Sequence, residues 1–288
     1  MSRFRILHAL LAAAMVGACA GSSSLDLSGM EFSDEPLLGK AVWHDLITED
    51  IDAARNFYQA LFGWSIVKSR EINGRDYFVA RAGDNYVAGM LEAGMRPDGA
   101  RISRWLPYVS VPDVDATVAS AINAGADVVV PPRDVALGRV AAITDPEGAV
   151  IGLARSNIGD PVDTAMGNRV AGTPVWIELL ANDRSAAAGF YDEVFPYDEQ
   201  EISRRGGQYT ILRAGGRERA GILENPVAGW DPEWLTYFGV VDPAASAAIA
   251  AANGGRIIAP VSPDLRDGSM AIVADPSGAI LVLQKIPQ

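Results

Sequence analysis

The sequence predicts an α+β protein made of four βαβββ modules. The first observation behind this prediction is an internal repeat, in which residues 42–46 (VWHDL) recur as residues 175–179 (VWIEL). The second is that further matches keep their order and spacing, such as residues 89–92 (GMLE) with residues 221–224 (GILE). A repeat of roughly 115 residues has the size of one domain. The third observation is that each repeat divides again into two modules.

The first repeat shows how the elements of a module follow one another. Residues 42–47 have strand character, and the apolar positions after Asp50 have helical spacing, with Asp50 as the N-cap and Gly63 as the end. Strands are then expected at residues 64–67, 76–81 and 86–91. The second module has the same order: a strand at 106–111, a helix at 113–124, and strands at 127–130, 139–144 and 149–153. The second repeat follows this pattern, and its Asp242-Pro243 pair marks a helix start.

Residues 1–18 are interpreted as a signal peptide, because Arg3 and Arg5 precede a short apolar stretch. The stretch ends in VGAC, which resembles the lipobox of bacterial lipoproteins and makes Cys19 the expected lipidation site. We expect residues 19–39 to form a lipidated tether, followed by a first domain at 40–154, a linker at 155–172 and a second domain at 173–285. The expected location is the cell envelope, with the lipid in the outer membrane and the body facing the periplasm.

Composition excludes several classes of function. The chain has 24 Lys and Arg against 36 Asp and Glu, a net charge of −12, so we expect no nucleic-acid partner, because phosphate binding needs clustered cations. The chain has one cysteine and two histidines, too few to supply the ligands of a zinc finger or the pairs of a disulfide framework.

The repeat resembles the vicinal oxygen chelate superfamily (VOC), which includes glyoxalase I, bleomycin-resistance proteins and extradiol dioxygenases. The resemblance rests on the motif DxxAAxxFYxxxFGW at residues 50–64, on the DPxG turns at 145–148 and 275–278, and on DVDA at 113–116. It covers roughly residues 40–153 and 173–284. It implies two tandem VOC domains, each with a cup around a small-molecule site.

Metal-using members of this superfamily carry ligands on the first and last strands of their modules. Here Gly152 and Val282 stand where the metal-dependent relatives have a glutamate on the last strand. Carboxylates alone favour hard, weakly held ions. We therefore expect no tightly bound metal or other cofactor, and a weakly bound divalent metal stays open.

The candidate catalytic residues are Asp45, its repeat counterpart Glu178, and His44. Strand alternation places Asp45 and His44 on opposite faces, so they cannot both point into one cup. A strand-end carboxylate bonded to a loop and an incidental histidine facing the helices stay open as alternatives. The candidate ligand-binding residues are aromatic and acidic pairs of the repeat: Trp43 with Trp176, Trp105 with Trp234, Tyr108 with Tyr237, and Glu92 with Glu224. For the aromatic pairs, a duplicated core is the alternative.

Three functions are compatible with these features. The favoured one is a lipid-anchored protein that binds or sequesters a small aromatic or apolar molecule without a metal. The second is a metal-dependent lyase, isomerase or dioxygenase that uses Asp45, Glu92 or His44. The third is a structural or interaction lipoprotein with vestigial cups. The expected partners are a small molecule and, through the anchor, a membrane, and a homodimer stays open.

Overall fold

The computed structural model describes residue 27 and residues 30–72, 74–94, 102–204, 207–227 and 229–287. The predicted signal peptide and Cys19 lie outside the described residues. Within those ranges, no helix is both long and apolar enough to span a bilayer.

The first half of the chain contains two βαβββ modules. The first comprises β1 (Ala41–Thr48), α2 (Ile51–Phe62), β2 (Ser65–Ile72), β3 (Arg75–Ala82) and β4 (Asn85–Glu92). The second comprises β5 (Arg104–Ser110), α3 (Val114–Asn123), β6 (Asp127–Val135), β7 (Gly138–Thr144) and β8 (Val150–Ser156). Strand β6 continues past the expected end at residue 130, through two prolines, because it lies at the edge of its sheet, where a missing amide donor is tolerated.

The second half repeats this order. Its first module comprises β9 (Pro174–Ala181), α4 (Arg184–Val194), β10 (Asp198–Arg204), β11 (Gly207–Ala214) and β12 (Arg217–Glu224). The last module comprises β13 (Glu233–Val240), α5 (Pro243–Ala252), β14 (Arg256–Ala259), β15 (Met270–Ala274) and β16 (Ile280–Lys285). Each of the four helices begins at an aspartate whose side chain accepts a backbone N–H of the first turn: Asp50, Asp113, Asp183 and Asp242.

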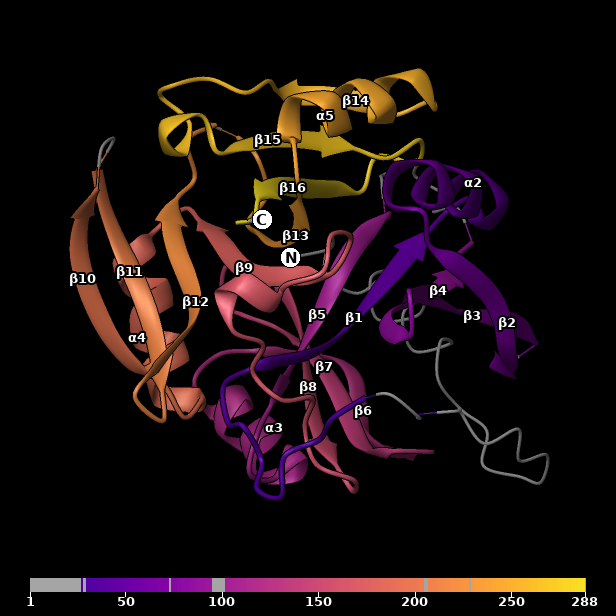
Figure 1. The fold of residues 1–288 in the computed structure, drawn as a ribbon. Helices are drawn as coiled ribbons and strands as arrows, with labels where there is room; N and C mark the ends of the chain where they lie inside the picture. The colour runs from indigo at the N-terminus through magenta and orange to yellow at the C-terminus, as the bar shows by residue number, and fades with distance from the viewer. Residues whose placement is uncertain are drawn as a thin grey trace.

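Each half forms one eight-stranded sheet, with the orders β2-β3-β4-β1-β5-β8-β7-β6 and β10-β11-β12-β9-β13-β16-β15-β14 (Figure 1). The first strand of each half is central: β1 pairs in parallel with β4 and antiparallel with β5, and β9 pairs likewise with β12 and β13. The predicted fold class, α+β with four βαβββ modules in two tandem units, is confirmed.

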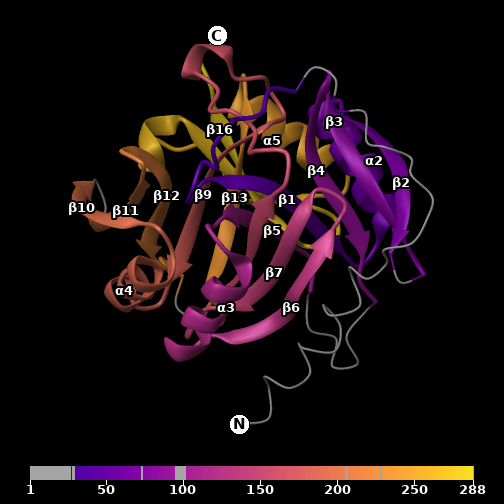
Figure 2. The same ribbon diagram turned by 90° about the horizontal axis from the view of Figure 1, so that it is seen from below.

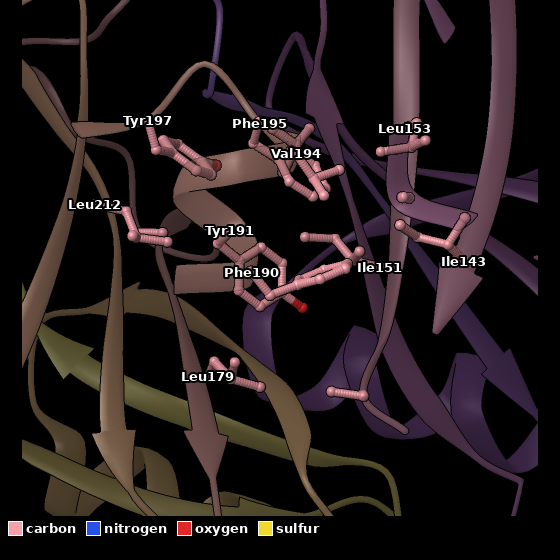
Figure 3. Packing of buried hydrophobic residues seen from close by; sticks show 14 of the residues in the cluster. Ile143, Ile151, Leu153, Leu179, Phe190, Tyr191, Val194, Phe195, Tyr197 and Leu212 are labelled. Carbon is pink, nitrogen blue, oxygen red and sulfur yellow. The ribbon is translucent and has the colours of Figure 1, made fainter. Parts of the chain in front are cut away.

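The helices pack across the two halves. Helix α2 of the first half contacts α5 of the second, and α3 contacts α4 (Figures 1 and 2). One core cluster joins the second module to the third, and Figure 3 shows Phe190, Tyr191 and Val194 of α4 directed toward Ile143 and Ile151 of the first half. A second cluster joins the first module to the fourth. The helix-bearing faces of both sheets are therefore buried against each other, and these two clusters together are called the shared core.

The conserved order of the repeat also places matching hydrogen bonds across this core. The Tyr58 hydroxyl donates to Asp275 of the second half at 3.1 Å, and the Tyr191 hydroxyl donates to Asp145 of the first half at 3.0 Å. Both aspartates also accept backbone N–H groups of their own DPxG turns. Each DPxG turn thus joins the two strands of a hairpin and also bonds to a tyrosine of the other half.

The opposite face of each sheet lines a cup. Strand alternation directs Asp45, Leu106 and Tyr108 into the first cup, among apolar side chains of β3, β6, β7 and β8. It directs Glu178, Leu235 and Tyr237 into the second cup, among side chains of β15 and β16. We use "first cup" and "second cup" for these two faces below.

Candidate functional site

Asp45 is a buried carboxylate at the centre of the first cup. It accepts a hydrogen bond from the Tyr77 hydroxyl at 2.7 Å and another from the Trp43 indole N–H at 2.9 Å. Burial raises the pKa of Asp45, and hydrogen bonds from Tyr77, Trp43 and Tyr108 oppose this rise. The groups that touch the carboxylate are therefore neutral donors.

Gly89 leaves the space in which the Tyr77 hydroxyl reaches the Asp45 carboxylate. The parallel pairing of β1 with β4 places Gly89 beside Asp45. A Cβ atom at this position would lie 1.8 Å from the Tyr77 hydroxyl oxygen and 2.2 Å from Asp45 Oδ1. In the second cup, a Cβ at Gly221 would lie 1.7 Å from the Tyr209 hydroxyl oxygen. Both cups thus need a glycine where a tyrosine hydroxyl reaches the carboxylate.

Glu178 is the equivalent carboxylate of the second cup, and its partners include a cation. The Tyr209 and Tyr237 hydroxyls donate to it at 2.6 Å and 2.5 Å. The Arg266 guanidinium forms an ion pair with Glu178 Oε2. The same guanidinium carbon lies 5.2 Å from the Tyr237 ring centre and 5.7 Å from that of Tyr209. Although burial opposes the shift, the Glu178 carboxylate raises the pKa of Arg266 above its ordinary value.

The loop that carries Arg266 has an unusual backbone. Arg266 and Asp267 have φ values of 47° and 55°, and they are the only non-glycine residues in the described ranges with positive φ. Such conformations cost of order 1–3 kcal/mol each and persist where the surroundings enforce them. The ion pair with Glu178 fastens this short turn (Arg266–Gly268) to the cup, and Ser269 after it is bonded to Gln284 and Lys285 of β16.

The first cup has a cavity where the second has Arg266. Ala136 is the positional counterpart of Arg266, since each lies nine residues before the aspartate of its DPxG turn and two before a glycine. The cavity has a volume of about 170 Å³ and is lined by Ala136, Trp43, Asp45, Tyr77 and Tyr108, together with apolar side chains of β3 and β7. Leu27, Met30 and Phe32 of the N-terminal segment also line it.

Positive charge surrounds the first cup, because Arg70, Arg139 and Arg155 line the cavity and Arg133 acts on Asp45. The Arg70 guanidinium carbon lies 5.2 Å from the centre of the Tyr77 ring, and Arg70 is exposed. Arg133 of β6 is half-buried. Its pKa is lowered by burial, and the lowering is opposed by Tyr108 and Asp45. Arg70 and Arg133 act on Asp45 through space, by charge attraction.

His44 lies on the opposite face of β1, as strand alternation predicts. Its Nδ1 is 3.2 Å from the Thr236 hydroxyl of β13, at the centre of the shared core. Burial lowers the pKa of His44 to about 3, so the ring is neutral near pH 7. The structure therefore does not bring this candidate together with Asp45.

Trp105 and Trp234 also lie in the shared core and not in the cups. The Trp105 indole donates to the Tyr58 hydroxyl at 3.0 Å, and the Trp234 indole donates to the Tyr191 hydroxyl at 2.8 Å. Trp105 and Trp234 therefore follow the alternative interpretation, in which the repeated aromatic residues form a duplicated core. The other aromatic candidates, Trp43, Tyr108, Trp176 and Tyr237, face the cups.

Glu92 and Glu224 end their strands in exposed positions and do not join the cup carboxylates. Glu224 instead accepts the backbone N–H of Arg184 at 3.4 Å. In the part of the chain that the structure describes, no three His, Cys, Asp or Glu residues cluster closely enough to hold a metal ion. A Cβ at Gly152 would lie 2.3 Å from Tyr108 Cδ1, so the tyrosine ring occupies the space of a side chain at that position. The residues present do not fit the metal centre of the metal-using VOC members.

Several residues of the cups were not among the sequence candidates. Tyr77 and Tyr209 carried a usable signal, because each stands four residues before a matching Arg-Ala-Gly sequence in the repeat. Gly89 and Gly221 match each other in the repeat, but the sequence does not show that each leaves space for a tyrosine hydroxyl. Arg266 had no signal, because the matching position of the first repeat is Ala136 and no local pattern shows that this loop reaches Glu178.

A family profile and curated relatives match the chain. Residues 40–153 match the profile of the Glyoxalase/Bleomycin resistance protein/Dioxygenase superfamily. The chain is 36% identical over 257 residues to "Putative glyoxylase CFP32" of Mycobacterium tuberculosis, covering 87% of this chain and 96% of that protein. It is 29% identical to "Anthracycline biosynthesis protein DauV" of a Streptomyces species, covering 84% of this chain and 91% of that protein.

Solved structures show the same fold. A Mn(II)-bound glyoxalase from Novosphingobium aromaticivorans superposes with a TM-score of 0.56 at 16% identity, covering 86% of this chain and 82% of that one. An extradiol ring-cleaving dioxygenase from B. fuscum superposes with a TM-score of 0.58 at 13% identity, covering 88% and 74%.

Proposed function

Because this chain belongs to the Glyoxalase/Bleomycin resistance protein/Dioxygenase superfamily, we propose that its first cup binds a small, largely apolar or aromatic molecule without a metal. The observation that carries this proposal is the cavity of about 170 Å³ that ends at a buried carboxylate. Its size is close to that of an engineered protein cavity of about 150 Å³ that accepts benzene. Apolar walls with a few convergent polar groups are typical of ligand sites.

A second candidate function is acid–base catalysis at the same place, in a lyase or isomerase. It is favoured by the raised pKa of Asp45, because a carboxyl group shifted toward neutral pH is a better general base or acid. The relative named as a glyoxylase agrees with this reading. The residues of the first cup offer this chemistry without a metal ion.

We further propose that the body is tethered by lipid at Cys19 and faces the periplasm from the outer membrane. The lipobox-like sequence before Cys19 supports this, and two or more acyl chains would anchor the protein stably, with about 0.8 kcal/mol for each buried CH₂. Membrane fractionation of wild type and Cys19→Ser tests it. The variant should move to the soluble fraction, and a variant that stays with the lipid would contradict the proposal.

The binding proposal is tested with one- and two-ring aromatic compounds and the full-length protein. A ligand that binds only the folded state raises the melting temperature. Ala154→Leu adds apolar volume inside the first cup and should abolish the rise. Ala252→Leu makes the same replacement on an exposed part of α5 and should leave the rise unchanged. A rise that survives Ala154→Leu would place the site elsewhere and refute the proposal.

A further inference from the structure

We propose that the ligand of the first cup carries one guanidinium or other amine-type cation, which binds Asp45 as Arg266 binds Glu178 in the second cup. This inference rests on the proposed function and names its ligand class. It follows from comparing the two cups of the same chain, of which one contains its own cation and the other contains a cavity.

The polar groups of the two cups correspond one to one. Each has a buried carboxylate, two tyrosine hydroxyls directed at it and a tryptophan indole beside them: Asp45, Tyr77, Tyr108 and Trp43 in the first cup, and Glu178, Tyr209, Tyr237 and Trp176 in the second. A carboxylate flanked by aromatic rings is a favourable site for an organic cation, through charge-assisted hydrogen bonds and cation–π attraction. In the second cup, Arg266 occupies that site as a built-in ligand.

Among the described residues of the first cup, Ala136 stands at the position that Arg266 has in the second, so the built-in cation is not repeated there. The space that a long side chain would enter is part of the cavity. Asp45 is also one methylene shorter than Glu178, which leaves more room in front of the carboxylate. Since a buried carboxylate is costly without a charged partner, a cation from outside would complete the arrangement that the second cup already shows.

Arg70 and Arg133 restrict the rest of the ligand. They act on Asp45 from β2 and β6 respectively, and Arg70 is exposed to solvent. Arg139, Arg155 and Asp160 also line the cavity, farther along the chain from Asp45. The positive charge of Arg70 and Arg133 opposes a second cation near them. The expected ligand is therefore a single cation at the inner end of a small apolar or aromatic body.

Benzamidinium and benzamide test the inference, because they have nearly the same shape and differ in charge. Isothermal titration of the full-length wild type should show benzamidinium binding at least about tenfold more tightly than benzamide. Asp45→Asn should remove this preference while benzamide binding remains. Equal binding of both probes, with both blocked by Ala154→Leu, would overturn the cation inference and leave the proposed function standing. No binding of benzamidinium at millimolar concentration would also overturn it.

A pair of variants at position 136 gives an independent test that needs no exogenous ligand. Ala136→Arg restores the residue of the second cup and should form an ion pair with Asp45, raise the melting temperature and block benzamidinium. Ala136→Met adds a long side chain without charge and is the matched control. If the arginine variant is no more stable than the methionine variant, or still binds benzamidinium, the inference is wrong.

Discussion

Replacement of Gly89 by alanine adds one methyl group in the first cup, and we expect it to destabilise the protein by about 2.5–6 kcal/mol. The new Cβ would lie 1.8 Å from the Tyr77 hydroxyl oxygen and 2.2 Å from Asp45 Oδ1, whereas real Cβ contacts stay above 3.0 Å. The hydroxyl and the carboxylate must both move, which breaks their 2.7 Å hydrogen bond. A buried hydrogen bond to a charged group contributes about 1.5–3 kcal/mol, and overpacking costs about 1–3 kcal/mol.

Urea unfolding followed by circular dichroism measures this effect. Gly189→Ala is the matched control, because Gly189 lies exposed inside α4 with no atom near its added Cβ. There the same methyl group should stabilise the protein by about 0.5–1 kcal/mol, since alanine is the better helix former. Gly221→Ala should behave like Gly89→Ala, because Tyr209 occupies the matching place. A Gly89→Ala protein as stable as the wild type would refute the described geometry of the first cup.

Three further predictions concern the shared core, the metal and the N-terminal segment. Burial lowers the pKa of His44 to about 3, so its contribution to stability is present above the unfolded value of about 6.5 and is lost as the pH falls toward 3. His44→Ile, which copies the second repeat, should therefore lose less stability than wild type between about pH 7 and about pH 4 in urea titrations. Burial raises the pKa of Asp275 to about 6, and this shift acts on the pH dependence in the opposite direction. Asp275 is present in both proteins, so its effect cancels in the comparison. The same pH dependence of stability in wild type and His44→Ile would therefore contradict the prediction. Chelator treatment should leave the melting temperature unchanged, and a drop reversed by added Mn²⁺ would refute the metal-free proposal. Asp160→Ala removes the acceptor of the Leu37 N–H at 2.7 Å and of the Ser110 hydroxyl at 2.6 Å, and should speed proteolysis of residues 30–40 at unchanged protease concentration. Equal cleavage rates would show that these bonds do not hold the segment.

The elements of the fold were predictable because their signals are local. Asp50 and Asp113 cap helices that begin where the sequence indicates, and the repeat carries this prediction into the second half. Strand alternation also placed Asp45 and His44 correctly on opposite faces. Each of these inferences needs only neighbouring residues or a match within the repeat.

The contents of the cups were harder to predict because they depend on contacts between distant strands. Trp105 looks like a cup residue in the sequence, but alternation along β5 directs it into the core and Leu106 into the cup. Arg266 reaches Glu178, which is 88 residues away in the chain, although the matching position of the first repeat is only an alanine, Ala136. A pairing of that kind follows from no local pattern.

The crossed packing of α2 with α5 and of α3 with α4 has a consequence for how the two cups could become different. In a symmetric homodimer of single repeats, both subunits carry the same side chain at every position, so an arginine that closes one cup closes the other as well. Joining two copies into one chain removes that identity while the apolar faces stay buried against each other. One copy can then carry Arg266, which fills its own cup, while the other carries Ala136 and keeps an open cup.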